Sequence, residues 1–244
     1  MWSFFSSSAK KPWTHYVSTD MHAHFLPGID DGAPDLSTSL DLIRGLQQMG
    51  YQRLIATPHI MPGFYPNTPQ TILSALNETK RAAEQLGLPI TLEAAAEYFM
   101  DESMEELIEQ DTILSFGQPK CVLVEMSFVS QAPMWESIFF LLQTKGYQPV
   151  LAHPERYAYF HGNLRAYQAF LDRGGWMQVN LTSLAGHYGK ATQRVAKELI
   201  KSGMIQLLGT DLHHHQHLHV LNTSLYSKEM EQVLSGVAWK NSVL

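Results

Sequence analysis

The stretch Thr19-Asp20-Met21-His22-Ala23-His24 decides the fold, because it predicts the end of a buried strand that carries two histidines. The histidines stand at positions i and i+2, a spacing that puts both side chains on the same face of a strand. Two imidazoles that converge on one point beside a carboxylate favour a metal site. A single His-x-His pair also fits ordinary packing, so the prediction depends on whether the pattern recurs.

The pattern recurs along the chain, because one apolar run after another ends in His, Asp or Glu. These run ends are Thr57-Pro58-His59, Ala95-Ala96-Glu97, Leu123-Val124-Glu125, Leu151-Ala152-His153 and Gly209-Thr210-Asp211-Leu212-His213. Helix-like segments separate the runs, for example 36–49 with apolar residues at helical spacing. The expected strands are 16–22, 53–57, 90–97, 121–125, 149–152, 176–180 and 205–210.

Seven strand-then-helix units predict an α/β fold, either a closed or nearly closed parallel barrel or a doubly wound open sheet. The polar residues that follow six of the seven strands favour the barrel. In a barrel the carboxyl ends of the strands form one ring around one mouth, where active sites lie. In an open sheet the outer strand ends would lie too far apart to share a site.

Composition narrows the class of protein. The 244 residues are 45% hydrophobic and 16% charged, which indicates a globular chain with a sizeable core. The net charge of −6 and the absence of a Lys/Arg cluster argue against a nucleic-acid binder. No apolar run approaches the roughly 20 residues of a membrane helix, and no secretory signal is predicted. We expect a flexible tail over residues 1–14 and one barrel domain over 15–244.

The single cysteine, Cys121, fits a reducing cytoplasm and excludes an intrachain disulfide. A cysteine-dependent tyrosine phosphatase needs an arginine six residues after its nucleophile, and Ser127 stands there. Cys121 is therefore predicted to be a small core residue.

The predicted ligands are too many for one tetrahedral zinc ion, which takes four. Mixed imidazoles and carboxylates suit two or three divalent ions, with Mn, Fe and Zn left open. Such ions lower the pKa of bound water toward roughly 7. They can also hold the attacking oxygen and the leaving oxygen of an in-line displacement at phosphorus. Arg156, three residues after His153, is predicted to bind a phosphate group; the alternative is a salt bridge to Glu155 or to a neighbouring loop.

Together these residues resemble the polymerase-and-histidinol-phosphatase (PHP) superfamily. They are most similar to its CpsB/YwqE branch of metal-dependent bacterial protein-tyrosine phosphatases, which act in capsule and exopolysaccharide synthesis. The matching elements span residues 20 to 213 in order: Asp20-Met21-His22-Ala23-His24, Asp30-Asp31-Gly32, Thr57-Pro58-His59, Ala96-Glu97, Val124-Glu125-Met126-Ser127, Ala152-His153-Pro154-Glu155-Arg156-Tyr157 and Thr210-Asp211-Leu212-His213.

The resemblance implies a distorted seven-stranded (β/α)7 TIM-like barrel, the PHP fold, with three metals and a metal-bridging hydroxide that attacks phosphotyrosine. It implies Arg156, Asp211 and His213 as catalytic residues. The implied substrate is a phosphotyrosine protein, such as a bacterial tyrosine kinase of polysaccharide export. The implied ligands are His22, His24, Glu97 and Asp211 at the first metal, Glu97, Glu125 and His153 at the second, and Asp31, His59 and His213 at the third.

Some assignments stay open. Phe64 and Tyr65 are predicted either to form an aromatic rim that stacks on a phosphotyrosine ring or to pack within a loop. The family usually carries a further arginine shortly after the Asp-x-His of the last strand, but 213–219 has none. Its extra histidines are predicted to form a solvated loop in which His213 alone is a ligand; the alternative is that they bind additional metal or replace the missing arginine as donors. A histidinol-phosphate type phosphatase, a C–N hydrolase and a non-catalytic metal-binding barrel are the alternative functions.

Overall fold

The computed structural model describes residues 13–224 and 227–244. Its strands are β1 (Thr19–Ala23), β2 (Arg53–Ala56), β3 (His59–Ile60), β4 (Thr91–Ala94), β5 (Glu97–Phe99), β6 (Cys121–Glu125), β7 (Gln148–Ala152), β8 (Trp176–Asn180) and β9 (Leu207–Gly209). Its α-helices are α1 (Leu36–Gln48), α2 (Pro69–Gln85), α3 (Glu102–Glu109), α4 (Trp135–Thr144), α5 (Leu164–Asp172), α6 (Leu181–Leu184), α7 (Gly189–Lys201), α8 (His215–Ser224) and α9 (Lys228–Leu234). Short 3-10 helices are η1 (Trp13–His15), η2 (Pro154–Arg156), η3 (Ala158–Phe160) and η4 (Lys240–Val243).

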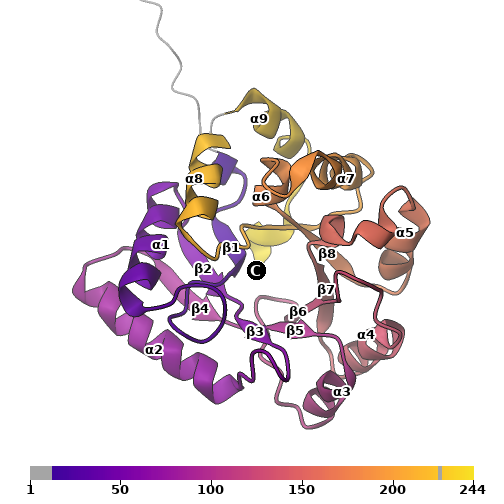
Figure 1. The fold of residues 1–244 in the computed structure, drawn as a ribbon, viewed down its shortest axis with the longest axis horizontal. Coiled ribbons are helices and arrows are strands. Elements are labelled where there is room, and N and C mark those ends of the chain that lie inside the picture. Colours follow the sequence, from indigo (N-terminus) through magenta and orange to yellow (C-terminus); the bar gives the residue numbers. More distant parts are fainter. Residues whose placement is uncertain (1–12, 225–226) are drawn as a thin grey trace, which may run out of the picture.

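The strands form a central ring of parallel elements with the helices outside it (Figure 1). Within the described residues, β1, β2 and β4 make a three-stranded sheet, and β3, β5, β6, β7, β8 and β9 make a six-stranded one. The ring continues from β9 to β1, since the Asp211 N–H donates to the His22 carbonyl and the His24 N–H to the Leu212 carbonyl, both at 2.8 Å. The predicted barrel-like α/β class is confirmed, although the strands do not make one closed sheet.

Two predicted strands are each split in two. The predicted strand 53–57 ends at Ala56 and resumes as β3 after Thr57-Pro58, and the predicted strand 90–97 breaks at Ala95-Ala96 before β5. Pro58 has no N–H to donate to a neighbouring strand, so the ladder cannot run through it unchanged. The two breaks place His59 and Glu97 at the start of the second segments, where the two residues are register partners.

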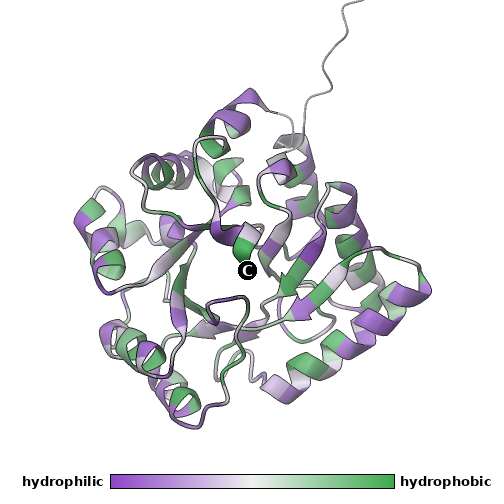
Figure 2. Ribbon diagram, turned by 180° about the vertical axis from the view of Figure 1, so that it is seen from behind, coloured by the Kyte–Doolittle hydropathy of each residue, from purple (hydrophilic) through white to green (hydrophobic). Residues whose placement is uncertain are grey.

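The helices cover the strands because each presents an apolar stripe to them, while hydrophilic stretches alternate along their length (Figure 2). In α1, for example, Leu42, Ile43 and Leu46 are buried, and the Asp35 side chain caps the first turn by accepting from the Thr38 N–H at 2.8 Å. Trp135 and Phe139 of α4 pack edge to face, with ring centroids 5.4 Å apart.

The inside of the ring is a small apolar cluster that closes the barrel below the strand ends. It comprises Met21, Ile55, Ala95, Phe116, Cys121, Leu123, Val150, Ala152 and Leu207. Cys121 is fully buried, as predicted for a core residue, and burial raises the pKa of its thiol to about 12. Leu244 packs on this cluster, and the chain ends near the centre of the ring (Figure 1).

Two expectations concern segments outside the barrel strands. Most of the predicted tail 1–14 lies outside the described residues, but Thr14 belongs to η1, is buried and donates to the Met49 carbonyl at 2.6 Å. The predicted solvated loop after His213 is wrong, because α8 starts at His215 and buries His217. In the described part of the chain, no helix is both long and apolar enough to cross a membrane.

Candidate metal centre

All nine predicted ligands lie together at the carboxyl ends of the strands. They come from seven different segments, which explains why no short motif contains the whole site. The nine are His22, His24, Asp31, His59, Glu97, Glu125, His153, Asp211 and His213.

Glu97 lies at the middle of the cluster and is fully buried. Its Oε1 is 2.9 Å from His153 Nε2, and its Oε2 is 3.1 Å from His22 Nε2. The same Oε2 lies 3.4 Å from both His24 Nε2 and His59 Nδ1. The two oxygens of one carboxylate therefore face four imidazoles.

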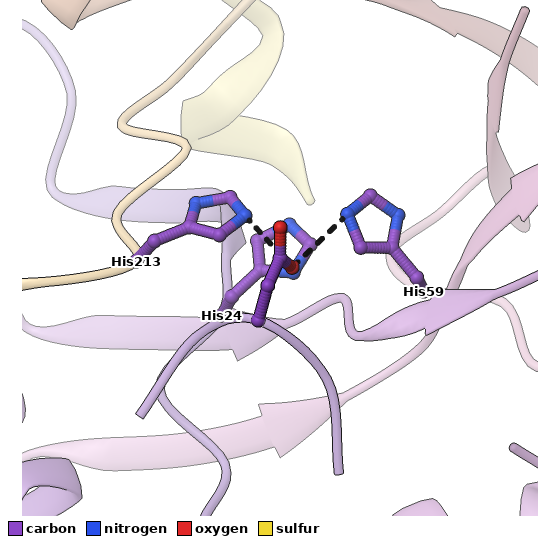
Figure 3. Close-up of side chains that lie close together, drawn as sticks. His24, His59 and His213 are labelled. Atoms are coloured by element: carbon purple, nitrogen blue, oxygen red, sulfur yellow. Dashed lines mark ion pairs between the residues drawn. The ribbon is translucent and has the colours of Figure 1, made fainter. Parts of the chain in front are cut away.

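The ligand atoms fall into overlapping groups, each with its atoms within 4.8 Å of one another. These groups are His24, Asp31, His59 and His213; His22, His24 and Asp211; His22, Glu97 and His153; and His59, Glu97 and Glu125. The first contains the whole set that the resemblance implies for the third metal and adds His24. Figure 3 shows the rings of His24, His59 and His213 converging; the Asp31 carboxylate lies 3.6 Å from His59 Nε2 and 3.5 Å from His213 Nε2.

Acceptor oxygens behind the imidazoles fix which ring nitrogen faces the cluster. His22 Nδ1 donates to Gln178 Oε1 at 2.8 Å, and His24 Nδ1 donates to Asp30 Oδ2 at 2.8 Å. The Nε2 atoms of these two rings therefore both face the cluster, 3.3 Å apart. Once deprotonated, two such nitrogens beside carboxylates are the donor set of a cation site, and metal-bound histidines are oriented in this way. The residues present thus fit divalent metal ions.

The contribution of β8, which ends without a candidate ligand, was not predicted from the sequence. Gln178 accepts from His22 and donates to Asn180 Oδ1 at 2.8 Å, and Asn180 Nδ2 donates to Asp211 Oδ2 at 2.6 Å. This buried amide pair connects the two candidate ligands that flank it. A usable signal was present, because Gln178 and Asn180 stand at i and i+2 in an apolar strand, as the two histidines of β1 do.

We expect the substitution Gln178→Met to weaken metal binding by about 10- to 100-fold, because it removes the acceptor that holds His22 in its binding tautomer. Metal affinity is measured by calorimetric titration of the metal-free protein. Gln148→Met, at the amino end of β7, is the matched control and should bind metal like the wild type. Equal affinities in the Gln178 and Gln148 variants, with both folded, would contradict this positioning role.

Arg156 is held beside the cluster by two aromatic rings and one carboxylate. Its guanidinium lies 4.5 Å from the centroid of Phe128 and 4.3 Å from that of Tyr188, and Nη1 donates to Asp211 Oδ2 at 3.0 Å. The ion pair with Asp211 is the predicted alternative of a salt bridge to a neighbouring loop. The salt bridge to Glu155 is not formed, and the buried Glu155 Oε1 instead accepts from the Asn180 N–H at 3.0 Å. Phe128 and Tyr188 were not predicted as site residues; they line the same pocket as Arg156.

The two predicted rim aromatics differ in their surroundings. Tyr65 stacks on the ring of His59, with centroids 5.3 Å apart and planes inclined by 18°. Phe64 is 72% exposed. Tyr65 thus packs on a candidate ligand, whereas the side chain of Phe64 is exposed to solvent. Their role toward substrate stays a prediction.

Backbone conformation at the strand ends is unusual. His153 and Asp211 have φ angles of 31° and 51°, in the left-handed region that costs non-glycine residues about 1–2 kcal/mol. Close packing adds a further constraint, since a Cβ on Gly32 would lie 2.0 Å from the His24 carbonyl oxygen. A Cβ on Gly209 would lie 2.6 Å from the Cβ of His22. A side chain at Gly32 or Gly209 would therefore displace the backbone or side chain of a candidate ligand.

The electrostatics of the protein without ions show how strongly the groups interact. Burial would lower the pKa of His22, but Glu97 and Asp211 outweigh it and raise that pKa to about 9. His59 is likewise penalised by burial, yet Glu97 and Glu125 raise its pKa to about 10. Burial would raise the pKa of Asp211, and the neighbouring His22, His213 and Arg156 nevertheless hold it well below its usual range. Protons thus supply the positive charge that bound cations would otherwise provide.

A ring of parallel strands with a buried imidazole–carboxylate cluster at its carboxyl ends defines a metal-binding α/β barrel. The family model "Capsular polysaccharide synthesis, CpsB/CapC" matches residues 18–237. The chain therefore belongs to the CpsB/CapC family.

Relatives agree with this assignment. Over 194 residues the chain is 30% identical to "Tyrosine-protein phosphatase YwqE" of Bacillus subtilis (strain 168), covering 80% of this chain and 76% of that protein. It is 27% identical to "Putative tyrosine-protein phosphatase CapC" of Staphylococcus aureus, with the same coverage. A structure from work on YwqE of Bacillus subtilis and CpsB of Streptococcus pneumoniae, described as "unique metal-dependent tyrosine phosphatases", has a TM-score of 0.76 at 28% identity, covering 89% of this chain and 91% of that one. A histidinol phosphate phosphatase of Lactococcus lactis shares the fold, with a TM-score of 0.54 at 15% identity and coverage of 88% and 93%.

Proposed function

We propose that this protein is a metal-dependent phosphatase that hydrolyses phosphotyrosine on proteins. The observation that carries the proposal is the position of Arg156, which lines the same pocket as seven of the nine candidate ligands. Family membership and the relatives named as tyrosine-protein phosphatases support it. The proposed substrate is a phosphotyrosine protein of capsule or exopolysaccharide synthesis, such as a bacterial tyrosine kinase of polysaccharide export, and the proposed location is the cytoplasm.

We propose two or three divalent ions, of Mn, Fe or Zn, held by the nine ligands. Bound ions of this kind supply hydroxide at neutral pH and offset negative charge on a phosphoryl group. The donor sets that the structure favours differ in detail from those implied by the resemblance, because His24 also faces Asp31 and His59 also faces Glu125. The proposed bridging ligand is Glu97, whose two oxygens face different imidazoles.

The chain's own residues account for the other parts of the reaction. Arg156 can donate to phosphate oxygens, and its two aromatic neighbours limit the directions in which its guanidinium can point. Asp211 accepts from Arg156 and Asn180 through Oδ2, so Oδ1 stays directed at His22 at 3.4 Å. Phe128, 46% exposed at the mouth, offers an aromatic face to a substrate ring.

The experiment that tests the proposal compares three substrates on the metal-loaded protein: a phosphotyrosine peptide, p-nitrophenyl phosphate and histidinol phosphate. We expect turnover of the first two, dependent on added Mn²⁺. Turnover of histidinol phosphate alone would favour the small-molecule phosphatase. Full metal content without turnover of any substrate would favour the non-catalytic barrel.

Metal loading at pH 7.5 should release about two protons per molecule, because His22 and His59 are protonated in the ion-free protein and must lose their protons to bind metal. Their raised pKa values stabilise the ion-free fold fully below about pH 6.5, and that contribution is lost as the pH rises through about 9 and 10. Calorimetry in buffers of different ionisation enthalpy counts the protons. A binding heat that is independent of the buffer would contradict the assignment of both histidines.

A further inference from the structure

A pair of histidines outside the nine candidate ligands lies on the wall of the same pocket. His217 belongs to α8, and His187 lies in the turn between α6 and α7. Both line the pocket that contains Arg156, Asp211 and His213. Neither has a part in the proposed reaction.

The two rings meet through nitrogen atoms in a geometry that suits a shared cation. Their Nε2 atoms are 3.2 Å apart, and their planes are nearly perpendicular, at 88°. Two imidazole nitrogens bound to one tetrahedral zinc ion, each about 2.0–2.1 Å from it, are separated by about 3.3 Å. The observed separation, at which the two nitrogens share a hydrogen bond, is close to that of two ligands of one ion, which would take the place of the shared proton.

The surroundings of His217 bear on which of its ring nitrogens carries the proton. Its Nδ1 lies 3.1 Å from the carbonyl oxygen of Asp211, an acceptor, and 3.3 Å from the backbone nitrogen of His213, a donor. The shorter contact assigns the proton to Nδ1, and Nε2 then accepts from the Nε2–H of His187, whose place a cation would take. The candidate ligand His213 is held in the same way, with its Nδ1 3.0 Å from the same carbonyl oxygen. Metal-bound histidines are characteristically oriented by a backbone carbonyl behind the ring. One oxygen thus orients two imidazoles, toward the main cluster and toward His187.

A further donor stands next to the pair. His214 is exposed at the pocket edge, and its ring centroid is 4.0 Å from that of His217. Imidazole donors without a carboxylate suit Zn²⁺, Ni²⁺ or Cu²⁺ and do not suit Mg²⁺ or Ca²⁺.

We propose that His187 and His217 bind an additional divalent cation of the zinc type, separate from the ions of the main cluster. The remaining coordination positions of this ion face the pocket, where water, His214 or an anionic group of a ligand can occupy them. The ion adds positive charge to the wall near Arg156. The inference concerns ion binding alone and stands apart from the reaction proposed above.

The test counts zinc on protein whose main cluster is first filled with Mn²⁺, by dialysis against Zn²⁺ and elemental analysis of both metals. We expect the sum of manganese and zinc to be one equivalent higher in wild type than in His187→Gln, whether or not zinc exchanges with manganese in the main cluster. His215→Gln, at an exposed position of the same helix, is the control and should bind zinc as the wild type does. An equal sum of the two metals in wild type and His187→Gln would overturn the proposal.

Crystals of the same Mn²⁺-loaded protein, soaked in Zn²⁺, give the location. We expect an anomalous peak at the zinc edge about 2.0–2.1 Å from both Nε2 atoms. Absence of that peak would overturn the proposal. A peak in soaked crystals would also overturn it if wild type and His187→Gln had the same metal content in solution. Zinc that merely replaces manganese in the main cluster would also count against it, because the sum of the two metals would then be equal in both proteins.

Discussion

Replacing Glu97 by glutamine should abolish phosphotyrosine turnover and lower metal content. Glu97 faces four imidazoles with its two carboxylate oxygens, and an amide would offer one neutral oxygen in place of two charged ones. Charge stabilisation by bound ions contributes several kcal/mol at the transition state, so kcat should fall by about 10³-fold or more. Turnover of a phosphotyrosine peptide and elemental analysis of the purified variant measure the two effects.

The matched control is Glu136→Gln, since Glu136 is exposed and pairs with Arg173 on the surface. It should keep wild-type turnover and metal content. Because the buried cluster contributes to the fold, thermal unfolding of both variants must be compared under the same metal concentration. A folded Glu97→Gln protein with full turnover would show that the assigned centre is not the active site.

Replacing Arg156 should impair catalysis and leave metal content unchanged. Its guanidinium contacts Asp211 through Oδ2 and is stacked between Phe128 and Tyr188, so its remaining N–H groups can reach a ligand in the pocket. Removing a donor that stabilises transition-state charge costs about 10²- to 10³-fold in rate, and we expect Arg156→Ala to lose kcat/KM in this range. Arg156→Lys should recover only part of it, because an ammonium keeps the charge without the planar donor fork.

Arg173→Ala removes an exposed arginine of a surface pair and should leave kcat/KM unchanged. Elemental analysis separates the two roles that Arg156 could have. If Arg156→Ala loses its metal along with its activity, the arginine acts by holding Asp211 in place and not by contacting phosphate.

The barrel and the ligand set were predictable from the sequence for a physical reason. Parallel strands are buried on both faces and form apolar runs, so a His or Glu at the end of each run is conspicuous. Because all such ends share one rim, recurrence along the chain indicated proximity in space. His59 and Glu97, 38 positions apart in the sequence, became register partners in this way.

Other features depended on tertiary contacts that periodicity does not reveal. Gln178 and Asn180 are neutral amides, which attract no attention as ligands, and only their distances to His22 and Asp211 show that they connect the two. The run of histidines after His213 was predicted to be a solvated loop because neutral histidine is common in loops and is the usual metal ligand only where several converge. In the structure α8 begins at His215 instead, and His217 is buried against the Asp211 carbonyl and His187. The contacts of Phe128 and Tyr188 with Arg156 were not predicted, because aromatic residues in a sequence indicate core packing as often as contact with an arginine.

The most direct test of the account is to strip the protein with chelator and to follow phosphotyrosine-peptide turnover as Mn²⁺ is added back. We predict that the stripped protein is inactive and that turnover returns as two to three ions bind per molecule. Turnover that persists in the stripped protein, at a rate indifferent to added ions, would contradict the claim that the strand-end cluster works by holding metal.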